Sequence, residues 1–205
     1  MSIANDTVPD GRLRSLGIFL DVVFALIFFR IVEFLPSFQD GHWVQLPHGL
    51  LGLLASSPAN LTRVIFGLMM TVYYWYRKNT FLSLLARSNG VLATLSIASL
   101  FFVCLFMYAL VADPTYAGGL PTLLLQSVSI LIGSSLSFVA LRYAIRADLV
   151  RPELKPSVEQ IARVDLSNPL AALVATGLSW SGLTIWTLSW FILMPLFAWL
   201  LARRK

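Results

Sequence analysis

Long apolar segments follow one another through most of this chain, and their length constrains the fold more than any other feature. Four of them have the roughly 20 residues that an α-helix needs to cross a bilayer. They cover residues 13–35, 61–85, 91–112 and 121–145. The 205 residues are 58% hydrophobic and only 12% charged, with a mean hydropathy of +0.78, and a soluble domain could not bury that much apolar surface. The sequence therefore predicts an all-α integral membrane protein.

The last apolar block, residues 170–202, is too long for one ordinary span and barely long enough for two. Lys and Arg mark cytoplasmic segments. They precede the first apolar segment, separate the second from the third, follow the fourth and end the chain. This alternation favours two short helices, 170–181 and 183–202, broken near residues 179–182. The chain would then have six transmembrane helices and two cytoplasmic termini. The alternative is one long tilted helix with an external C-terminus.

The two long connections differ in character. Residues 37–60 carry a short apolar run at 46–55, which we expect at the outer membrane interface. Residues 146–168 are charged and contain two prolines, as in a cytoplasmic linker, with a short helix expected around 157–164. Neither connection is large enough to be a second domain. Residues 1–205 are therefore predicted to form a single transmembrane domain without a cleavable signal.

Several classes of site are not indicated. The net charge of +5 is explained by basic residues at helix ends, so it does not predict nucleic-acid binding. Cys104 is the single cysteine, which excludes an internal disulfide and favours a buried apolar role. His42 and His48 share the external connection without metal-ligand spacing. We expect no metal or other cofactor, and no enzyme, because no nucleotide loop, nucleophile elbow or carboxylate pair is present.

The first apolar segment contains three charged residues, Asp21, Arg30 and Glu33. A charge at bilayer depth costs at least about 2.5–3.5 kcal/mol, so it normally faces protein or water and marks a pathway. At 100° per residue, Val22, Leu26, Phe29 or Arg30, and Glu33 form one stripe, with Asp21 near its edge.

A purely structural interpretation of these charges remains open. Asp21 could pair with Arg14 or with a basic group on the second helix. Arg30 and Glu33 are three residues apart and could form an ion pair near the outer interface.

Residues 19–26, Phe-Leu-Asp-Val-Val-Phe-Ala-Leu, resemble the first-helix signature of the bacterial and lysosomal potassium channel family of transmembrane protein 175. That signature is an Arg, then Phe-Ser-Asp, then a Gly-Val-Phe-Ala-Ile-like run. The end of the second helix is similar to the family pattern of a Trp, a His pair and a Phe. Here Trp75, Lys78, Asn79 and Phe81 hold those places.

The resemblance implies a homotetramer in which the first helix of each subunit lines a central pore. It implies an apolar constriction at Leu26, with Phe29 or Arg30 and then Glu33 on the next pore-facing turns. It also implies a structural polar network between the first helix and the end of the second. The members of that network would be Arg14, Phe19, Asp21, Trp75, Lys78 and Asn79.

Departures from the family pattern keep three functions open. Leu20 replaces the signature serine, and Arg14 lies one residue further from Asp21 than the arginine of the family signature does from its aspartate. Lys78 could supply Asp21 with a cation where histidines are usual. Arg30 is the main departure, because four arginines around a narrow pore would favour anions.

We therefore expect a plasma-membrane channel weakly selective for potassium or other monovalent cations. The alternatives are an anion-permeable relative and a non-conducting membrane subunit that assembles with a partner.

Overall fold

The computed structural model describes residues 11–32, 58–111 and 119–203, with the backbone alone at 32, 58–64 and 110–111. Every regular element in these ranges is helical. Four long helices come first along the chain: α1 (Gly11–Val32), α3 (Pro58–Ser83), α4 (Gly90–Val111) and α5 (Leu120–Arg146). Two short helices, α6 (Lys155–Asp165) and α7 (Ser167–Leu178), lead to the last helix, α8 (Leu183–Arg203). Single 3₁₀ turns, η2 (Pro152–Leu154) and η3 (Ser179–Ser181), precede α6 and α8.

The helices occupy the segments expected from hydropathy. α5 begins beside Pro121, whose fixed φ and missing N–H suit the first turn of a helix. α6 covers the short helix expected around 157–164. Because the apolar runs are long and their ends carry Pro, Gly or charged residues, the sequence signal and the helices coincide closely. Residues 33–35 of the first predicted segment and residue 112 of the third lie outside the described ranges.

The last apolar block is broken where its sequence indicated. η3 covers Ser179–Ser181, and Gly182 follows with φ of 87°, a conformation that L side chains rarely adopt. α7 and α8 then pack against each other as a helical hairpin. The alternative of one continuous helix is therefore wrong.

Three helices in the described part of the chain are long and apolar enough to cross a membrane: α4, α5 and α8. α1 and α3 have 22 and 26 residues, and they carry charged residues along their length. α7 has only 12 residues, about 18 Å of helix against a hydrocarbon core of about 30 Å. The fold is thus compatible with a multi-pass membrane protein built on at least these three spans.

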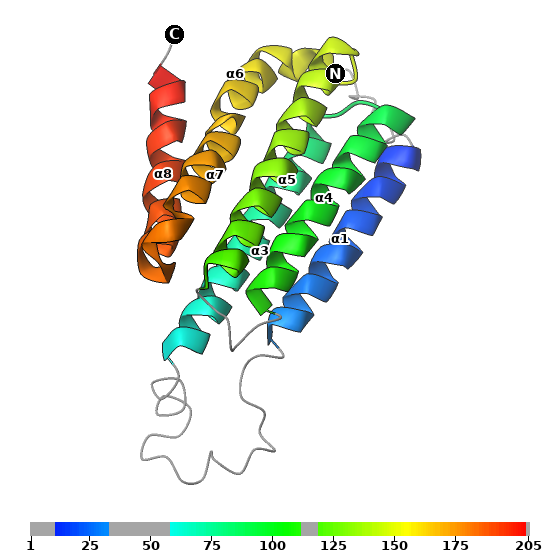
Figure 1. The fold of residues 1–205 in the computed structure, drawn as a ribbon. Helices are drawn as coiled ribbons and strands as arrows, with labels where there is room; N and C mark the ends of the chain where they lie inside the picture. The colour runs from blue at the N-terminus through cyan, green and yellow to red at the C-terminus, as the bar shows by residue number, and fades with distance from the viewer. Residues whose placement is uncertain (1–10, 33–57, 112–118, 204–205) are drawn as a thin grey trace, which may run out of the picture.

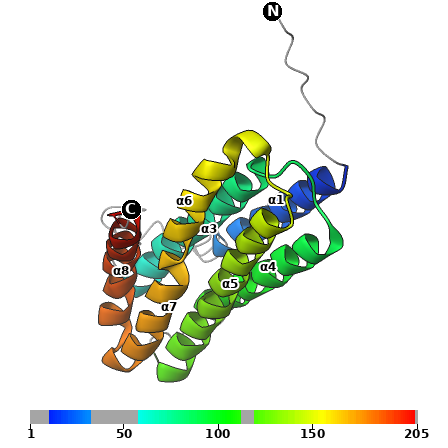
Figure 2. The ribbon, with the colours of Figure 1, turned by 90° about the horizontal axis from the view of Figure 1, so that it is seen from above.

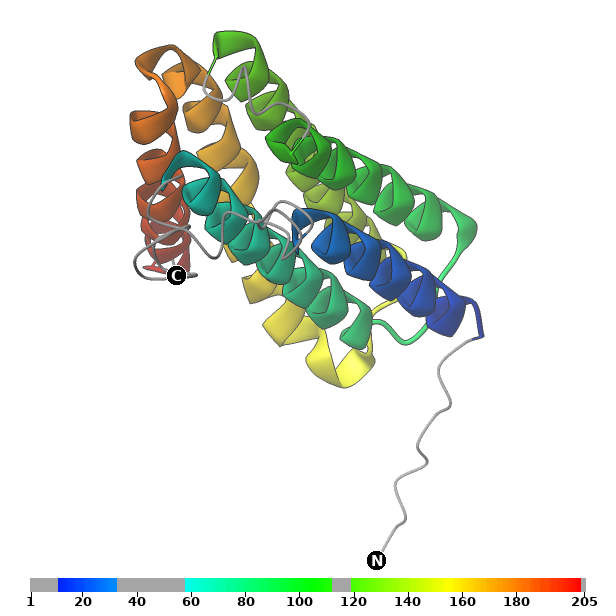
Figure 3. The same ribbon diagram turned by 90° about the horizontal axis from the view of Figure 1, so that it is seen from below.

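The bundle is arranged as neighbouring helical pairs. α4 packs along α5, α5 along α7, and α7 along α8, while α1 packs against α3 and α4 (Figure 3). α1 and α8 lie on opposite sides of the bundle (Figure 2). The start of α1, the end of α8 and the whole of α6 lie at the same end (Figure 1).

Small and polar residues bring α4 and α5 close together. A Cβ on Gly133 would lie 3.2 Å from both the Phe102 Cβ and the Ser99 carbonyl oxygen. The Ser99 hydroxyl donates a 2.7 Å hydrogen bond to the Gly133 carbonyl. Close backbone approach with a serine bond across the interface is typical of helix pairs in membranes, where apolar burial alone provides little driving force.

The connections at the α6 end are joined by backbone hydrogen bonds. Leu85 and Val150 form an isolated antiparallel bridge between the α3–α4 and α5–α6 connections. The Ala86 N–H donates to the Leu149 carbonyl at 2.8 Å, and the Arg151 N–H donates to the Leu84 carbonyl at 3.0 Å. These bonds hold the two connections together beside α6.

Candidate functional site

α1 has two apolar faces, of which the bundle covers one. Leu16, Leu20, Phe24 and Ile31 are buried against α3 and α4, and their four- and seven-residue spacings place them on one helix face. This packed face fixes the rotation of α1 about its own axis. The sequence could not fix that rotation, because both faces are similarly apolar.

The opposite face of α1 contains the residues expected to line a pore. Leu26 and Phe29 are 62% and 63% exposed, and Val22 is 53% exposed. The Arg30 side chain is exposed on the same side. Such an apolar face on a helix of this length must be covered by lipid or by protein. Glu33, the remaining residue of the predicted stripe, lies outside the described residues.

Asp21 is held by α3. The Trp75 Nε1 donates a 2.9 Å hydrogen bond to the Asp21 Oδ1. The two side chains border a small cavity of about 210 Å³ between the helices, which Phe24, Phe28 and Val72 also line. A carboxylate in this position is directed to α3 rather than left to face lipid. Two members of the expected polar network are therefore in contact.

Lys78 does not join that contact. Its side chain is only 3% exposed, and its Nζ donates to the hydroxyls of Ser99 (3.0 Å) and Ser137 (3.3 Å). The expectation that Lys78 supplies Asp21 with a cation is wrong, because the lysine side chain points toward α4 and α5. The hydrogen-bond donor to Asp21 is Trp75 instead. The remaining three members of the expected network, Arg14, Phe19 and Asn79, lie on the surface or partly buried, and no described hydrogen bond links them to Asp21.

A second polar cluster was not foreseen from the sequence. Arg77 forms an ion pair with Asp165, and it also donates a 2.7 Å hydrogen bond to the Tyr73 hydroxyl. Tyr73 in turn donates to the Asn168 Oδ1 at 2.6 Å. The cluster joins α3 to α6 and α7 across more than 80 residues of sequence. The one feature of the sequence that could have indicated this cluster is the four-residue spacing of Tyr73 and Arg77, which places them on one helix face.

Other candidate residues add no site. Cys104 is partly buried in α4. His42 and His48 lie outside the described residues. Within residues 11–32, 58–111 and 119–203, no three His, Cys, Asp or Glu side chains are grouped as metal ligands.

These features define a class, a helical membrane protein whose first helix leaves an apolar face unpacked. Comparison with family models, with curated proteins and with solved structures finds no match.

Proposed function

We propose that the chain is one subunit of a homotetrameric ion channel of the plasma membrane, weakly selective for potassium and other monovalent cations. α1 of each subunit lines a central pore, and Leu26 forms its main constriction. The termini are cytoplasmic. The observation that carries this proposal is the exposed face of α1, where Leu26 and Phe29 remain uncovered by their own subunit.

Two further features support the proposal. The hydrogen bond from Trp75 to Asp21 ties α1 to α3, so that α1 can present a fixed face to other copies. α1 also lies at one side of the bundle, away from α8, where copies can meet around it (Figure 2). The resemblance of residues 19–26 to the signature of the potassium channel family adds independent support.

Ions would pass an apolar constriction rather than a filter of backbone carbonyls. Rings of Leu26 and Phe29 would gate the pore by wetting and dewetting. Arg30 follows on the same face, and its charge would oppose cations unless an acidic group offsets it. Selectivity is therefore expected to be weak and to depend on Arg30.

Potassium flux from liposomes tests the constriction. Leu26→Ala should raise flux severalfold, because it widens the narrowest ring. Leu188→Ala is the matched control: it makes the same truncation at a 54% exposed position on α8, at the other side of the bundle. Flux of this variant should equal that of the parent. A monomeric particle with no flux above empty vesicles would refute the proposal.

Bilayer recordings test selectivity. Arg30→Gln should shift the reversal potential toward that of potassium, because a positive ring is removed from the pathway. A parent reversal potential that follows the chloride gradient would instead identify an anion-permeable channel. A stable complex with another protein, and no tetramer of the chain alone, would identify a non-conducting subunit.

A further inference from the structure

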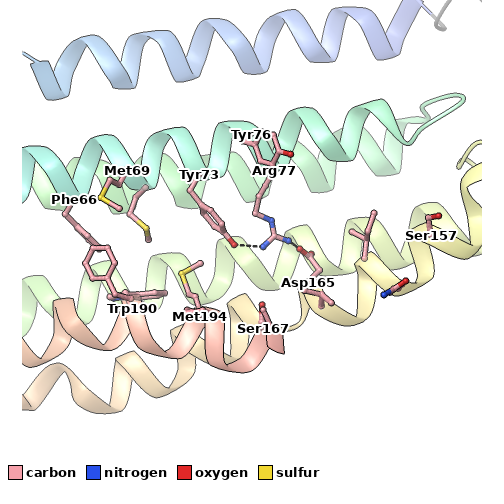
Figure 4. A pocket seen from close by; sticks show the side chains of 17 residues that line it. Phe66, Met69, Tyr73, Tyr76, Arg77, Ser157, Asp165, Ser167, Trp190 and Met194 are labelled. Atoms are coloured by element: carbon pink, nitrogen blue, oxygen red, sulfur yellow. Dashed lines mark hydrogen bonds and ion pairs between the residues drawn. The ribbon is translucent and has the colours of Figure 1, made fainter. Parts of the chain in front are cut away.

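A cavity of about 760 Å³ lies between α3, α6 and α8 (Figure 4). Its volume falls within the range of about 300–1,000 Å³ that is common for small-molecule sites. α3 contributes residues that share one helix face, including Phe66, Met70, Tyr73 and Arg77. Met194 and Ala198 form part of the facing wall on α8.

The chemistry of the cavity changes along its length. At one end the Phe66 ring contacts Trp186 and Phe191, with ring centroids 5.9 and 6.1 Å apart. Arg77 and Asp165 lie further along the cavity, and beyond them the lining continues along α6 to Ser157 (Figure 4). Phe66 and Arg77 are eleven residues apart on α3, which places them about 16 Å apart along the helix axis. The cavity is therefore long and apolar beside Phe66, and its α6 part carries the charged pair and polar residues.

The cavity opens on the apolar surface of the bundle. Met69, Tyr76 and Phe191 line it and are 50%, 65% and 47% exposed. α8, which forms one wall, is one of the helices apolar enough to cross a membrane. If α8 spans the membrane, an opening bordered by these residues would face lipid rather than water. Methionines in the wall adapt readily to a flexible chain.

The α6 part of the cavity can hold a headgroup. The guanidinium of Arg77 has five N–H donors. In the described part of the chain, one of them binds the Tyr73 hydroxyl and one binds the Asp165 carboxylate. Three donors therefore remain for another acceptor. The same end of the bundle carries the exposed cations Lys155 and Arg163 on α6. It also carries Arg203, stacked 3.7 Å over the Trp199 ring centroid. Basic groups at the membrane surface attract anionic headgroups.

We propose that this cavity is a binding site for an anionic phospholipid. One acyl chain lies between α3 and α8, with its end against Phe66. The phosphate accepts hydrogen bonds from the free N–H groups of Arg77. The site is independent of the pore-lining face of α1, which lies on the other side of the bundle (Figure 2).

Photolabelling tests the site. The full chain is reconstituted into phosphatidylcholine vesicles containing phosphatidylglycerol with a photoreactive group in its acyl chain. After irradiation, labelled residues are identified by peptide mass spectrometry. Labels on Met70 and Met194, which line the cavity, should exceed those on Phe101, which is 60% exposed on α4. Equal or weaker labelling of the cavity residues would overturn the proposal.

Filling the cavity provides a second measurement. Ala198→Trp and Met69→Trp each add a large side chain to the cavity wall. A lipid chain would then have to overpack the cavity, which weakens binding, so labelling of Met70 and Met194 should fall by about tenfold. Val139→Trp is the control, because Val139 is 48% exposed on α5 and lies away from the cavity. Gel filtration confirms that each variant keeps its size, and either filling variant alone suffices as a test.

Two results would overturn the proposal even if labelling is observed. The first is unchanged labelling in a filling variant of normal size. The second is a zero-length cross-link between α8 and α3 of different copies, which would show that a second chain occupies the cavity.

Arg77→Lys keeps the charge beside Asp165 but removes the planar fork of donors, so it should weaken labelling by phosphatidylglycerol.

Discussion

Three charged side chains on α1 and α3 bond to partners on other helices. Asp21 accepts a hydrogen bond from Trp75, Arg77 pairs with Asp165, and Lys78 donates to Ser99 and Ser137. The last arrangement is unusual, because two neutral hydroxyls rather than a carboxylate receive the ammonium group. Serines on α4 and α5 therefore have two roles: Ser99 allows close helix packing, and Ser99 and Ser137 accept hydrogen bonds from the buried amine of Lys78.

Outside the membrane-spanning helices, Asp148 is the residue whose charge is most clearly coupled to folding. It follows α5 with φ of 57°, a left-handed conformation that Asp and Asn tolerate better than most residues. The hydrogen bond and the charge of Lys155 hold the pKa of the Asp148 carboxyl below its usual value, and Arg87 acts in the same direction. A lowered pKa in the folded state stabilises the fold above the unfolded pKa of about 3.9.

Asp148→Asn should therefore lower stability at neutral pH, because the amide suits the same backbone conformation but cannot pair as an anion. The difference from the parent should be small, because the pair is exposed. It should begin to shrink as the pH falls below about 4, the pKa of the carboxyl in the unfolded chain, and vanish once the pH is below the lower pKa of the folded state. Thermal unfolding in detergent between pH 3 and 7 measures it. A difference that is constant across this range would show that the charge contributes nothing.

At the scale of the elements, the turn between α7 and α8 depends on one residue. Gly182 has φ of 87°, and a Cβ there meets no atom within 4 Å, so a side chain would be disfavoured by backbone conformation rather than by space. The turn reverses the chain and lets α8 pack along α7. A strained turn would weaken that packing.

Gly182→Ala should destabilise the protein by about 1–3 kcal/mol, because φ of 87° with ψ of 169° is a backbone conformation that essentially only glycine adopts. Gly177→Ala is the matched control, since Gly177 lies inside α7, is exposed and also has open space around its Cα. That control should be neutral or stabilising by about 0.5–1 kcal/mol. Chemical denaturation in detergent compares the two. Equal effects would argue against the turn as the cause.

Most of the helices could be predicted from hydropathy, because an apolar run of fixed length has few other solutions in a membrane. α6 and the break before Gly182 were also foreseen, from charged and turn-forming residues respectively. The partners of Lys78 and Arg77 were not foreseen. Ser99 lies 21 residues from Lys78, and Asp165, the ion-pair partner of Arg77, lies 88 residues from it, so only helix packing could place these side chains together.

At the scale of the whole molecule, the helices alternate in direction so that α6 and the end of α8 lie at one end, and η3 lies at the other (Figure 1). We propose, from the distribution of Lys and Arg, that the first end is cytoplasmic. The proposed six-helix topology depends on this assignment, and so does the position of the lipid headgroup.

Single-cysteine labelling tests the orientation, and it is direct here because Cys104 is the single native cysteine. In a Cys104→Ser background, Glu159→Cys on α6 should react with an impermeant maleimide only in inside-out vesicles. Trp180→Cys in η3, which replaces a 68% exposed side chain, should react only in right-side-out vesicles. Labelling of both positions from one side would disprove the proposed topology.

The sequence alone determined that this is a helical membrane protein, where its helices run and where its last apolar block turns back, because these properties depend on local composition and spacing. The tertiary structure decided which face of α1 stays exposed, which partners Asp21, Lys78 and Arg77 have, and that a cavity lies between α3, α6 and α8. Helices that are apolar on every side carry no pattern that fixes their rotation. Side chains such as Ser99, Trp75 and Asp165 fix it only when the helices pack.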